Sequence, residues 1–209
     1  MAEILIVIAI IGIVAVMIFS TIYKKIEEKR TIAQVKSNIE TFSHAYRMVL
    51  DEYGSVVGLR DSRKSIWKQN EIFFDAMAKY LKISKKCGLQ SRDKACFPKK
   101  VRNLSKTMSF YWWEHNNIIM GQLTNGVSFW LLNYSEGGTQ MLFDINGGDK
   151  GPNILGVDQF YFNAFTDEGI NVNKSTRTCD KKIDKTNKYQ GGVCYEHILK
   201  YNNMDYWYK

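Results

Sequence analysis

Apolar residues fill the first part of the chain without interruption. Every position from 4 to 19 is apolar or glycine, and residues 20–23 carry the uncharged run up to Lys24. About 20 residues therefore separate Glu3 from the first lysine, and a helix of that length spans the roughly 30 Å hydrocarbon core of a bilayer. The run has no polar face, which a helix in a soluble core would show, and no small-residue cleavage pattern follows it. We expect residues 1–23 to form a membrane-spanning helix that stays in the mature protein.

Periodic apolar positions continue the helix beyond the lysines. They recur mostly at steps of three and four residues, the spacing of one face of an amphipathic helix: Ile26, Ile32, Val35, Ile39, Phe42, Tyr46, Val49, Leu50 and Tyr53. No proline interrupts this stretch, and Gly54 is a natural helix end. The pattern predicts one helix from about residue 2 to 53. Half of it would lie in lipid, and half, about residues 24–53, would pack on a globular domain that occupies residues 24–209.

The rest of the chain changes from helical to strand character. Apolar and aromatic residues from Trp67 to Leu81 predict a second short helix, whereas short alternating or apolar runs further along predict strands. The predicted strands cover residues 108–113, 118–120, 127–132, 140–145 and 159–165. Asn125-Gly126 is a strong signal for a hairpin turn between two of them. Helices followed by strands predict an α+β fold in which an antiparallel sheet covers the apolar face of the long helix.

Four cysteines fall into two pairs along the sequence, Cys87 with Cys96 and Cys179 with Cys194. Neither pair has the spacing of a zinc knuckle, about two to four residues, and no histidine stands directly beside either pair. In a chain whose amino terminus faces a membrane, two disulfides in an oxidising compartment are favoured. Metal binding and free thiols remain alternatives, and sequential pairing is the most economical of the three connectivities.

The excess of basic residues is concentrated in one stretch. The chain has 29 Lys and Arg against 21 Asp and Glu, and between residues 79 and 106 ten basic residues face Asp93 alone. Such a stretch is typical of a solvated loop, and it is also a surface that could contact DNA or acidic surface polymers. Aromatic residues are sparse in it, so nucleic acid is not the favoured partner. The candidate contact residues are Lys85, Lys86, Arg92, Lys94, Lys99, Lys100 and Arg102.

Oxygen-bearing side chains cluster in a glycine-rich stretch around the end of the predicted strand 140–145. Asp144, Asn146, Asp149 and Asp158 lie at spacings that resemble those of a calcium-binding loop. The terminal glutamate and the spacing of an EF-hand are missing. The same residue types, with glycine and proline, also build tight turns between strands. A structural turn and a calcium site are both open at this point, and no other cofactor is expected.

No arrangement of catalytic residues is visible. The three histidines, His44, His115 and His197, stand apart from any motif that places a nucleophile or an orienting acid beside them. Aromatic residues gather in the predicted strands, where we expect sheet core and subunit contacts rather than a cofactor pocket: Phe110, Tyr111, Trp112, Trp113, Phe129 and Trp130. We do not expect the protein to be an enzyme.

The N-terminal stretch resembles the amino terminus of type IV pilins and type II secretion pseudopilins. In that family the prepilin motif runs glycine, cleavage site, phenylalanine, threonine, leucine, any residue and glutamate, and a long apolar helix follows. Here Met1-Ala2-Glu3 and ILIVIAIIGIVA match from the leucine position onward, and Gly12 stands where the family has a mid-helix glycine. The basic leader and the first residues of the motif would then lie upstream of Met1. Ser20 stands where many members have a proline, so the helix has less reason to open there.

The resemblance implies a pilin-like fold and a structural role in a type IV pilus, or fimbrium, or in a type II secretion pseudopilus. The subunit would cross the bacterial inner membrane once, with its globular domain in the periplasm or outside the cell. Prepilin peptidase would cut and methylate it, and an inner-membrane assembly platform would build it into a polymer with itself or with other pilins. Glu3 would meet the amino terminus of a neighbouring subunit, and Gly12 would lie in the packed filament core. The alternative is a minor, competence-type pilin that binds DNA or another ligand through residues 79–106.

Overall fold

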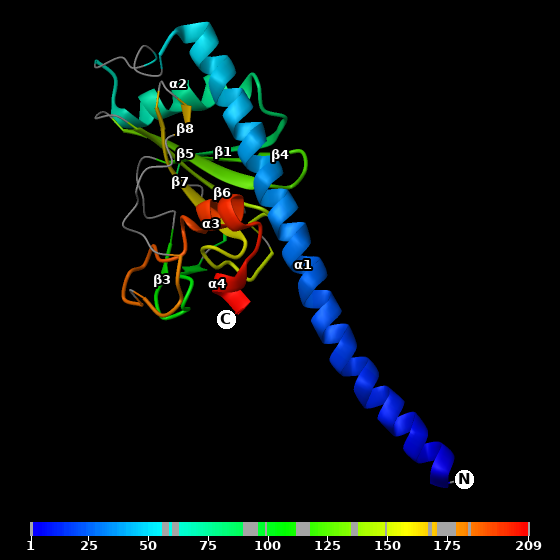
Figure 1. The fold of residues 1–209 in the computed structure, drawn as a ribbon. Coiled ribbons are helices and arrows are strands. Elements are labelled where there is room, and N and C mark those ends of the chain that lie inside the picture. The colour runs from blue at the N-terminus through cyan, green and yellow to red at the C-terminus, as the bar shows by residue number, and fades with distance from the viewer. Residues whose placement is uncertain are drawn as a thin grey trace.

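The computed structural model describes residues 2–55, 59, 63–89, 96–98, 100–111, 118–134, 138–148, 150–166, 169–170, 179–183 and 185–208. Helices and strands follow one another along the chain as shown in Figure 1. The helices are α1 (Ala2–Tyr53), α2 (Ile66–Ala78), α3 (Cys194–Tyr201) and α4 (Asp205–Tyr208). The strands are β1 (Ile83–Leu89), β2 (Val101–Arg102), β3 (Ser109–Phe110), β4 (Ile119–Leu123), β5 (Ser128–Tyr134), β6 (Gly138–Asp144), β7 (Gln159–Thr166) and β8 (Gly169–Ile170). The α+β class is confirmed.

Helix α1 runs unbroken for 52 residues and extends far beyond the rest of the fold (Figure 1). It contains no proline, and it ends where Gly54 takes a left-handed backbone with φ +72°, which a side chain would strain. The Gly54 N–H donates to the Leu50 carbonyl at 2.7 Å and closes the last turn. At 1.5 Å per residue the helix is roughly 78 Å long. The long helix predicted from residue 2 to 53 is therefore present.

The C-terminal half of α1 packs on the sheet through one face. Its buried apolar residues recur at helical spacing: Ile32, Val35, Ile39, Phe42, Ala45, Tyr46 and Val49. Phe42 is fully buried, and its ring centroid lies 5.2 Å from that of Phe129 and 6.2 Å from that of Phe143. Ile26, which the periodicity assigns to the same face, is exposed. The packed half therefore begins near Ile32, several residues later than the lysines suggest.

The main sheet has six strands in the order β1-β4-β5-β6-β7-β8, and each neighbouring pair is antiparallel. The predicted hairpin joins β4 to β5. Gly126 there has φ +88°, and the Asn125 side chain accepts the Val127 N–H at 3.1 Å. Gly126 supplies the positive φ of this turn, and Asn125 stabilises it through its side chain, as in an Asx turn.

Both faces of the main sheet are covered. Along β5, Phe129 and Leu131 belong to the cluster beneath α1 and α2, whereas Trp130 and Leu132 belong to a second cluster on the other face. The small sheet of β2 and β3 and the residues near the first cysteine pair close that second cluster: Cys87, Cys96, Phe97, Val101 and Phe110. The sequence pattern predicts only the helix-covered face, because periodicity does not reveal that residues 96–110 fold back over the sheet.

Five described elements differ from the sequence prediction: β1, β2, β8, α3 and α4. Strand β1 lies in the stretch interpreted as a basic loop, and its pairing with β4 shows two register shifts. It is an edge strand, and Lys85 and Lys86 on it are exposed, which protects an open edge from pairing with another chain. Strands β2 and β8 have two residues each, and helices α3 and α4 have 8 and 4 residues, so all four are too short for periodicity to reveal.

Candidate functional site

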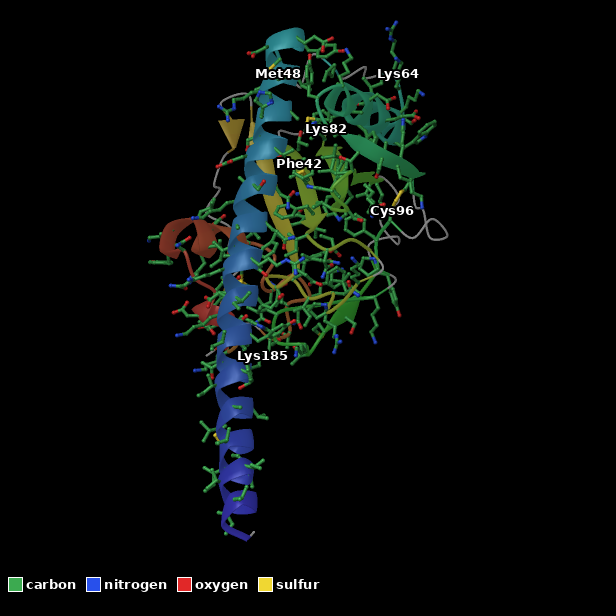
Figure 2. The ribbon with its side chains drawn as sticks, turned by 90° about the vertical axis from the view of Figure 1, so that its right-hand side faces the viewer. Phe42, Met48, Lys64, Lys82, Cys96 and Lys185 are labelled. Atoms are coloured by element: carbon green, nitrogen blue, oxygen red, sulfur yellow. A yellow bond between two sulfur atoms is a disulfide. The ribbon has the colours of Figure 1, made fainter. Side chains whose placement is uncertain are left out.

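The N-terminal half of α1 presents apolar side chains on all sides. Figure 2 shows this half projecting below the domain with no other element beside it. Among the described residues, this is the helix that is long and apolar enough to cross a membrane. Fifteen large apolar side chains on it are between 48% and 70% exposed: Ile4, Ile6, Val7, Ile8, Ile10, Ile11, Ile13, Val14, Val16, Met17, Ile18, Phe19, Ile22, Tyr23 and Ile26.

Such a surface is unstable in water. Burying one large apolar side chain is worth about 1.5–3 kcal/mol, so covering this set would lower the free energy by on the order of 20–40 kcal/mol. Exposed apolar surface of this extent marks a site of contact with a membrane or with other chains. Because the side chains point in every direction around the helix axis, lipid or several neighbouring helices can cover them, and one flat partner cannot.

The two residues predicted for filament assembly lie on this half of α1. Glu3 is part of the helix, and its side chain lies outside the described set. At Gly12 an added Cβ would meet nothing within 4 Å, so packing within one chain gives no reason for glycine there. Close approach of a second helix would give one. The hydroxyls of Ser20 and Thr21 donate to the Met17 carbonyl at 2.9 and 3.2 Å, which satisfies them in apolar surroundings.

Both cysteine pairs are disulfides, and the pairing is sequential. Cys87 on β1 is joined to Cys96 with their Cα atoms 6.3 Å apart, and Cys179 is joined to Cys194 at the start of α3 with a separation of 5.0 Å. Both separations lie in the usual range for disulfides. The first holds the segment 96–98 against the second face of the sheet. The second ties the loop that begins at residue 179 to α3.

The candidate DNA-contacting residues do not collect into one surface within the described part of the chain. Lys86 Nζ lies 2.6 Å from Asp75 Oδ1 and 3.7 Å from Glu71 Oε1, so two acids on α2 neutralise it. The exposed members are divided between β1 and the start of the small second sheet: Lys85, Lys100 and Arg102. The remaining members lie outside the described residues: Arg92, Lys94 and Lys99.

Asp144, the first residue of the candidate calcium loop, is buried and holds the turn after β6. Its Oδ1 accepts the N–H groups of Asn146 and Gly147 at 3.1 and 3.0 Å. Its Oδ2 accepts the Gln159 side-chain amide at 2.9 Å, from the first residue of β7. One carboxylate therefore joins the turn to the neighbouring strand.

Asp158 closes the same loop from its other end. Its Oδ2 and Oδ1 accept the N–H groups of Asn153 and Ile154, both at 2.7 Å. Asn146 Nδ2 donates to the Gly151 carbonyl at 3.0 Å and reaches Asp158 Oδ2 at 3.5 Å, so it bridges the two ends of the loop. The role of a structural turn, one of the two predicted for these residues, accounts for most of their hydrogen bonds.

The charges and oxygen atoms of the loop would suit a bound cation. Burial, together with the charge of Asp158, raises the pKa of Asp144 to about 7, and burial raises the pKa of Asp158 to about 6, although hydrogen bonds oppose both shifts. Two amide oxygens, Asn146 Oδ1 and Asn153 Oδ1, are buried and accept no hydrogen bond from the residues described. Carboxylate and amide oxygens are calcium ligands. Asp149 lies outside the described residues, among which no group of three acidic, histidine or cysteine side chains could hold a metal.

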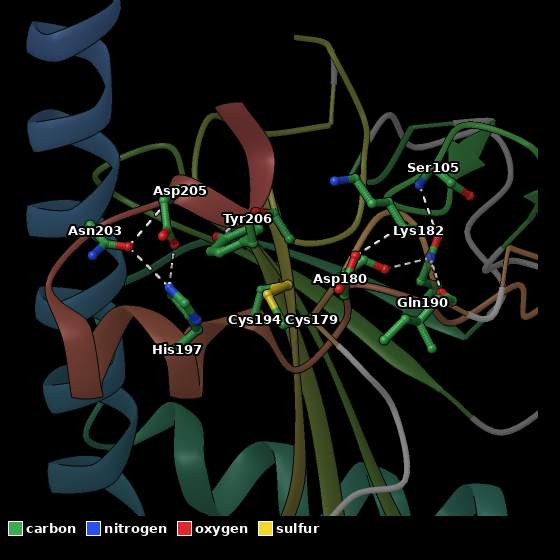
Figure 3. Close-up of a disulfide and its surroundings, with 12 residues drawn as sticks. Ser105, Cys179, Asp180, Lys182, Gln190, Cys194, His197, Asn203, Asp205 and Tyr206 are labelled. Carbon is green, nitrogen blue, oxygen red and sulfur yellow. Dashed lines mark hydrogen bonds and ion pairs between the residues drawn. A yellow bond between two sulfur atoms is a disulfide. The ribbon is translucent and has the colours of Figure 1, made fainter. Parts of the chain in front are cut away.

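A pocket of about 510 Å³ beside the Cys179–Cys194 disulfide was not predicted (Figure 3). The tip of the hairpin from β2 to β3 meets the disulfide loop and the C-terminal helices there. The lining residues are Ser105, Thr107, Cys179, Asp180, Lys181, Lys182, Lys185, His197, Asp205 and Tyr206. Its signal in the sequence is a group of four lysines between Cys179 and Cys194, of which Lys181, Lys182 and Lys185 line the pocket. That this group meets the hairpin tip could not be read from the sequence, because the two are far apart along the chain.

The histidines occupy separate places in the structure. His44 is exposed on α1, and His115 lies outside the described residues. His197 lies in the pocket, with its Nε2 atom 2.8 Å from Asp205 Oδ1 and 3.0 Å from Asn203 Oδ1 (Figure 3). These contacts, together with the neighbouring rings of Tyr201 and Tyr206, hold the His197 ring in place.

Comparison of the chain with protein-family profiles, with curated proteins and with solved structures gives no match. Three features of the described residues bear on function: the exposed apolar half of α1, the loop between residues 144 and 158, and the pocket at the second disulfide.

Proposed function

We propose that the protein is a structural subunit of a type IV pilus or of a type II secretion pseudopilus. The observation that carries this proposal is α1 itself. Its first half is covered by no described residue, while its second half is part of the core of a disulfide-bearing α+β domain. A plain membrane anchor does not need this continuity, because a flexible linker would serve it equally well. A filament subunit needs it, since the helix has to place the domain at a fixed position on the polymer.

The apolar half of α1 would serve in two environments. In the bacterial inner membrane it would act as a single-pass anchor, with the domain in the periplasm, and helix contacts there would depend on small residues and polar groups. Outside lipid the same surface has to be buried, so helices of neighbouring copies or of other pilins would cover it. A charge at the membrane edge is costly unless it is paired. Glu3 would therefore find its partner in the amino group of an adjacent subunit.

The assembly proposal is tested by the amount of subunit in sheared surface filaments. We expect Glu3→Gln to insert in the membrane normally and to be lost from the filament fraction, because the charge pair between subunits is removed. Glu27→Gln is the matched control. Glu27 is an acid further along the same helix, where it pairs with Arg30 across 3.8 Å. Equal filament yield from Glu3→Gln and the unmodified chain would contradict the assembly role of Glu3.

Processing gives a second and independent test. If prepilin peptidase acts on the protein, the reading frame upstream of Met1 encodes a Lys/Arg-rich leader that ends in glycine, followed by phenylalanine and threonine. The mature chain isolated from cells should then begin two residues before Met1 and carry a methylated amino group. Intact-mass spectrometry measures both properties. A cell-derived chain that begins at Met1 without methylation would refute the prepilin proposal.

DNA binding through residues 79–106 is the alternative function, as in a competence-type minor pilin. The structure gives it little support, because Lys86 is already paired and the exposed cations are divided between two sheets. Calcium binding is a proposal for the loop instead, with Asp144, Asp158, Asn146 and Asn153 as the oxygen donors. There the ion would neutralise two buried carboxylates. A gel shift with duplex DNA and a calcium titration, both on the full chain, separate these possibilities.

A further inference from the structure

The pocket at the Cys179–Cys194 disulfide brings several lysines together. Lys181, Lys182 and Lys185 line it, and Lys106 lies at the hairpin tip between the lining residues Ser105 and Thr107. Within the described part of the chain, none of these four lysines forms an ion pair with a carboxylate. Lysines elsewhere in the structure do have such partners: Lys68, Lys79 and Lys86.

Two of the four ammonium groups converge on one aromatic ring. Lys106 Nζ lies 4.9 Å and Lys181 Nζ 4.7 Å from the centroid of the Trp207 indole. Each contact is attractive by itself. Together the two positive charges make this side of the pocket favourable for a negative group.

Buried amides hold the frame of this pocket in place. Gln190 is fully buried, its Nε2 donates to the carbonyls of Asp180 and Ile183, and its Oε1 accepts the Ser105 N–H at 2.9 Å (Figure 3). Asn103, also fully buried, donates from Nδ2 to the Lys185 carbonyl at 3.1 Å. The disulfide loop is thus pinned to the hairpin tip. The lysine backbones are positioned before any ligand arrives, which reduces the entropic cost of binding.

The pocket also contains carboxylates, and these argue against a ligand that is only an anion. Asp180 Oδ1 accepts the Lys182 N–H at 2.7 Å, and Asp205 Oδ1 lies 2.8 Å from His197 Nε2. These carboxylates would repel a bare anion, but they can accept hydrogen bonds from hydroxyl groups. Two ammonium groups already lie 4.9 and 4.7 Å from the centroid of the Trp207 ring, which leaves less of that ring for stacking a nucleic-acid base. A ligand with one anionic group and several hydroxyls would suit both the lysines and the carboxylates of the pocket.

We propose that this pocket binds an anionic sugar, meaning a hexose unit that carries a phosphate or a carboxylate. Lys106 and Lys181 would bind the anionic group. The Asp180 carboxylate would accept hydrogen bonds from the sugar hydroxyls, and the Ser105 hydroxyl could accept or donate one. The volume of about 510 Å³ fits one such unit, within the range of small-ligand sites. Sugars of this kind occur in acidic surface polymers. The proposal does not depend on filament assembly, since the pocket belongs to a single chain.

Calorimetric titration of the full chain in detergent micelles tests the proposal. The probes are glucose 6-phosphate, glucuronic acid, neutral glucose, inorganic phosphate and a short DNA duplex. We expect both anionic sugars to bind saturably, at one site per chain. Neutral glucose and inorganic phosphate should each bind at least about tenfold more weakly. Glucose lacks the anionic group, and inorganic phosphate lacks the sugar hydroxyls. Added salt should weaken the binding without abolishing it.

Two variants localise the binding. Lys181→Gln should weaken the binding of glucose 6-phosphate by about tenfold or more, because a charge-assisted hydrogen bond is lost. Lys188→Gln is the matched control, since Lys188 lies on the same loop, over the Tyr189 ring, and does not line the pocket. It should change the affinity by less than about twofold. Near-ultraviolet circular dichroism confirms that both variants fold.

Several outcomes would overturn the proposal. The proposal would be wrong if neither glucose 6-phosphate nor glucuronic acid bound saturably. It would also be wrong if Lys181→Gln and Lys188→Gln lost the same amount of affinity. Inorganic phosphate binding as tightly as glucose 6-phosphate would show a plain anion site and refute the sugar. A DNA duplex that binds more tightly than either sugar, with the same sensitivity to Lys181→Gln, would assign the pocket to nucleic acid instead.

Discussion

Asp144 and Asp158 should make stability fall as the pH rises. In the unfolded chain both carboxyls titrate near the ordinary aspartate pKa of about 3.9. In the fold, burial raises the pKa of Asp144 to about 7 and that of Asp158 to about 6. From about pH 4 to about pH 7 the folded state thus holds protons that the unfolded state has lost. Because falling pH favours the state that binds more protons, the free energy of unfolding should decrease as the pH rises through this window.

The size of the effect follows from the two pKa shifts. One pKa unit corresponds to about 1.4 kcal/mol. Between about pH 5 and pH 8, Asp144 contributes about two units and Asp158 about one, which gives about 4 kcal/mol as an upper value. Part of the Asp144 shift is the charge of Asp158, and this part is absent while Asp158 is protonated. We therefore expect a loss of about 3 kcal/mol.

Chemical denaturation of the full chain in detergent micelles with a chelator, followed by tryptophan fluorescence at several pH values, measures this loss. Asp144→Asn keeps an oxygen for the Asn146 and Gly147 amides but removes the charge. In this variant the free energy of unfolding should fall by only about 1 kcal/mol between about pH 5 and pH 8. Asp51→Asn is the control, since Asp51 is exposed on α1 and should leave the slope unchanged. A slope that persists in Asp144→Asn, or stability that rises with pH in the unmodified chain, would refute the reasoning.

Three further outcomes are expected. Phe42→Ala should destabilise the fold by about 3–5 kcal/mol in the same assay, because a fully buried ring leaves a cavity, while His44→Ala on the exposed face should stay within about 0.5 kcal/mol. Gly121→Ala should cost about 1–3 kcal/mol, since its Cβ would lie 2.8 Å from Phe74 Cζ, whereas Gly12→Ala meets nothing within 4 Å and should not lower the domain's stability. Above about pH 7, millimolar calcium should raise the denaturation midpoint of the unmodified chain but not that of Asp144→Asn; identical midpoints with calcium and with chelator would contradict the calcium proposal.

The long helix and the central strands could be predicted because their patterns extend over many residues. The apolar steps around Phe42 identify a helix face, and the Asn125-Gly126 pair identifies the β4–β5 turn. Strand β1 could not be predicted, since its exposed Ser84, Lys85 and Lys86 show no alternation. What makes it a strand is pairing with β4, and that pairing depends on residues thirty or more positions away.

The candidate sites could likewise be predicted only where the residues involved are close together in the sequence. Clustering of Asp144 with Asp158 is visible in the sequence, but burial of both carboxylates among backbone N–H groups is not. The lysine pocket requires Lys106 and Lys181 to meet at Trp207, and no local pattern joins these three positions. Charge counted along the chain points to residues 79–106, whereas among the described residues the structure brings only Lys106 from that stretch to the pocket, where it meets Lys181 from the second disulfide loop.

The unbroken course of α1 also determines how the molecule would carry tension. A pull on the N-terminal half would enter the domain along a continuous hydrogen-bonded rod and leave it through side-chain packing around Phe42. Such a load shears a whole interface at once, and it does not open strand pairs one after another. Glu28 accepts the Met204 N–H, and Lys36 donates to the Asn202 side chain, each at 2.7 Å, near the place where the helix emerges. The C-terminal segment is thereby fastened to the rod where a load on the helix would enter the domain.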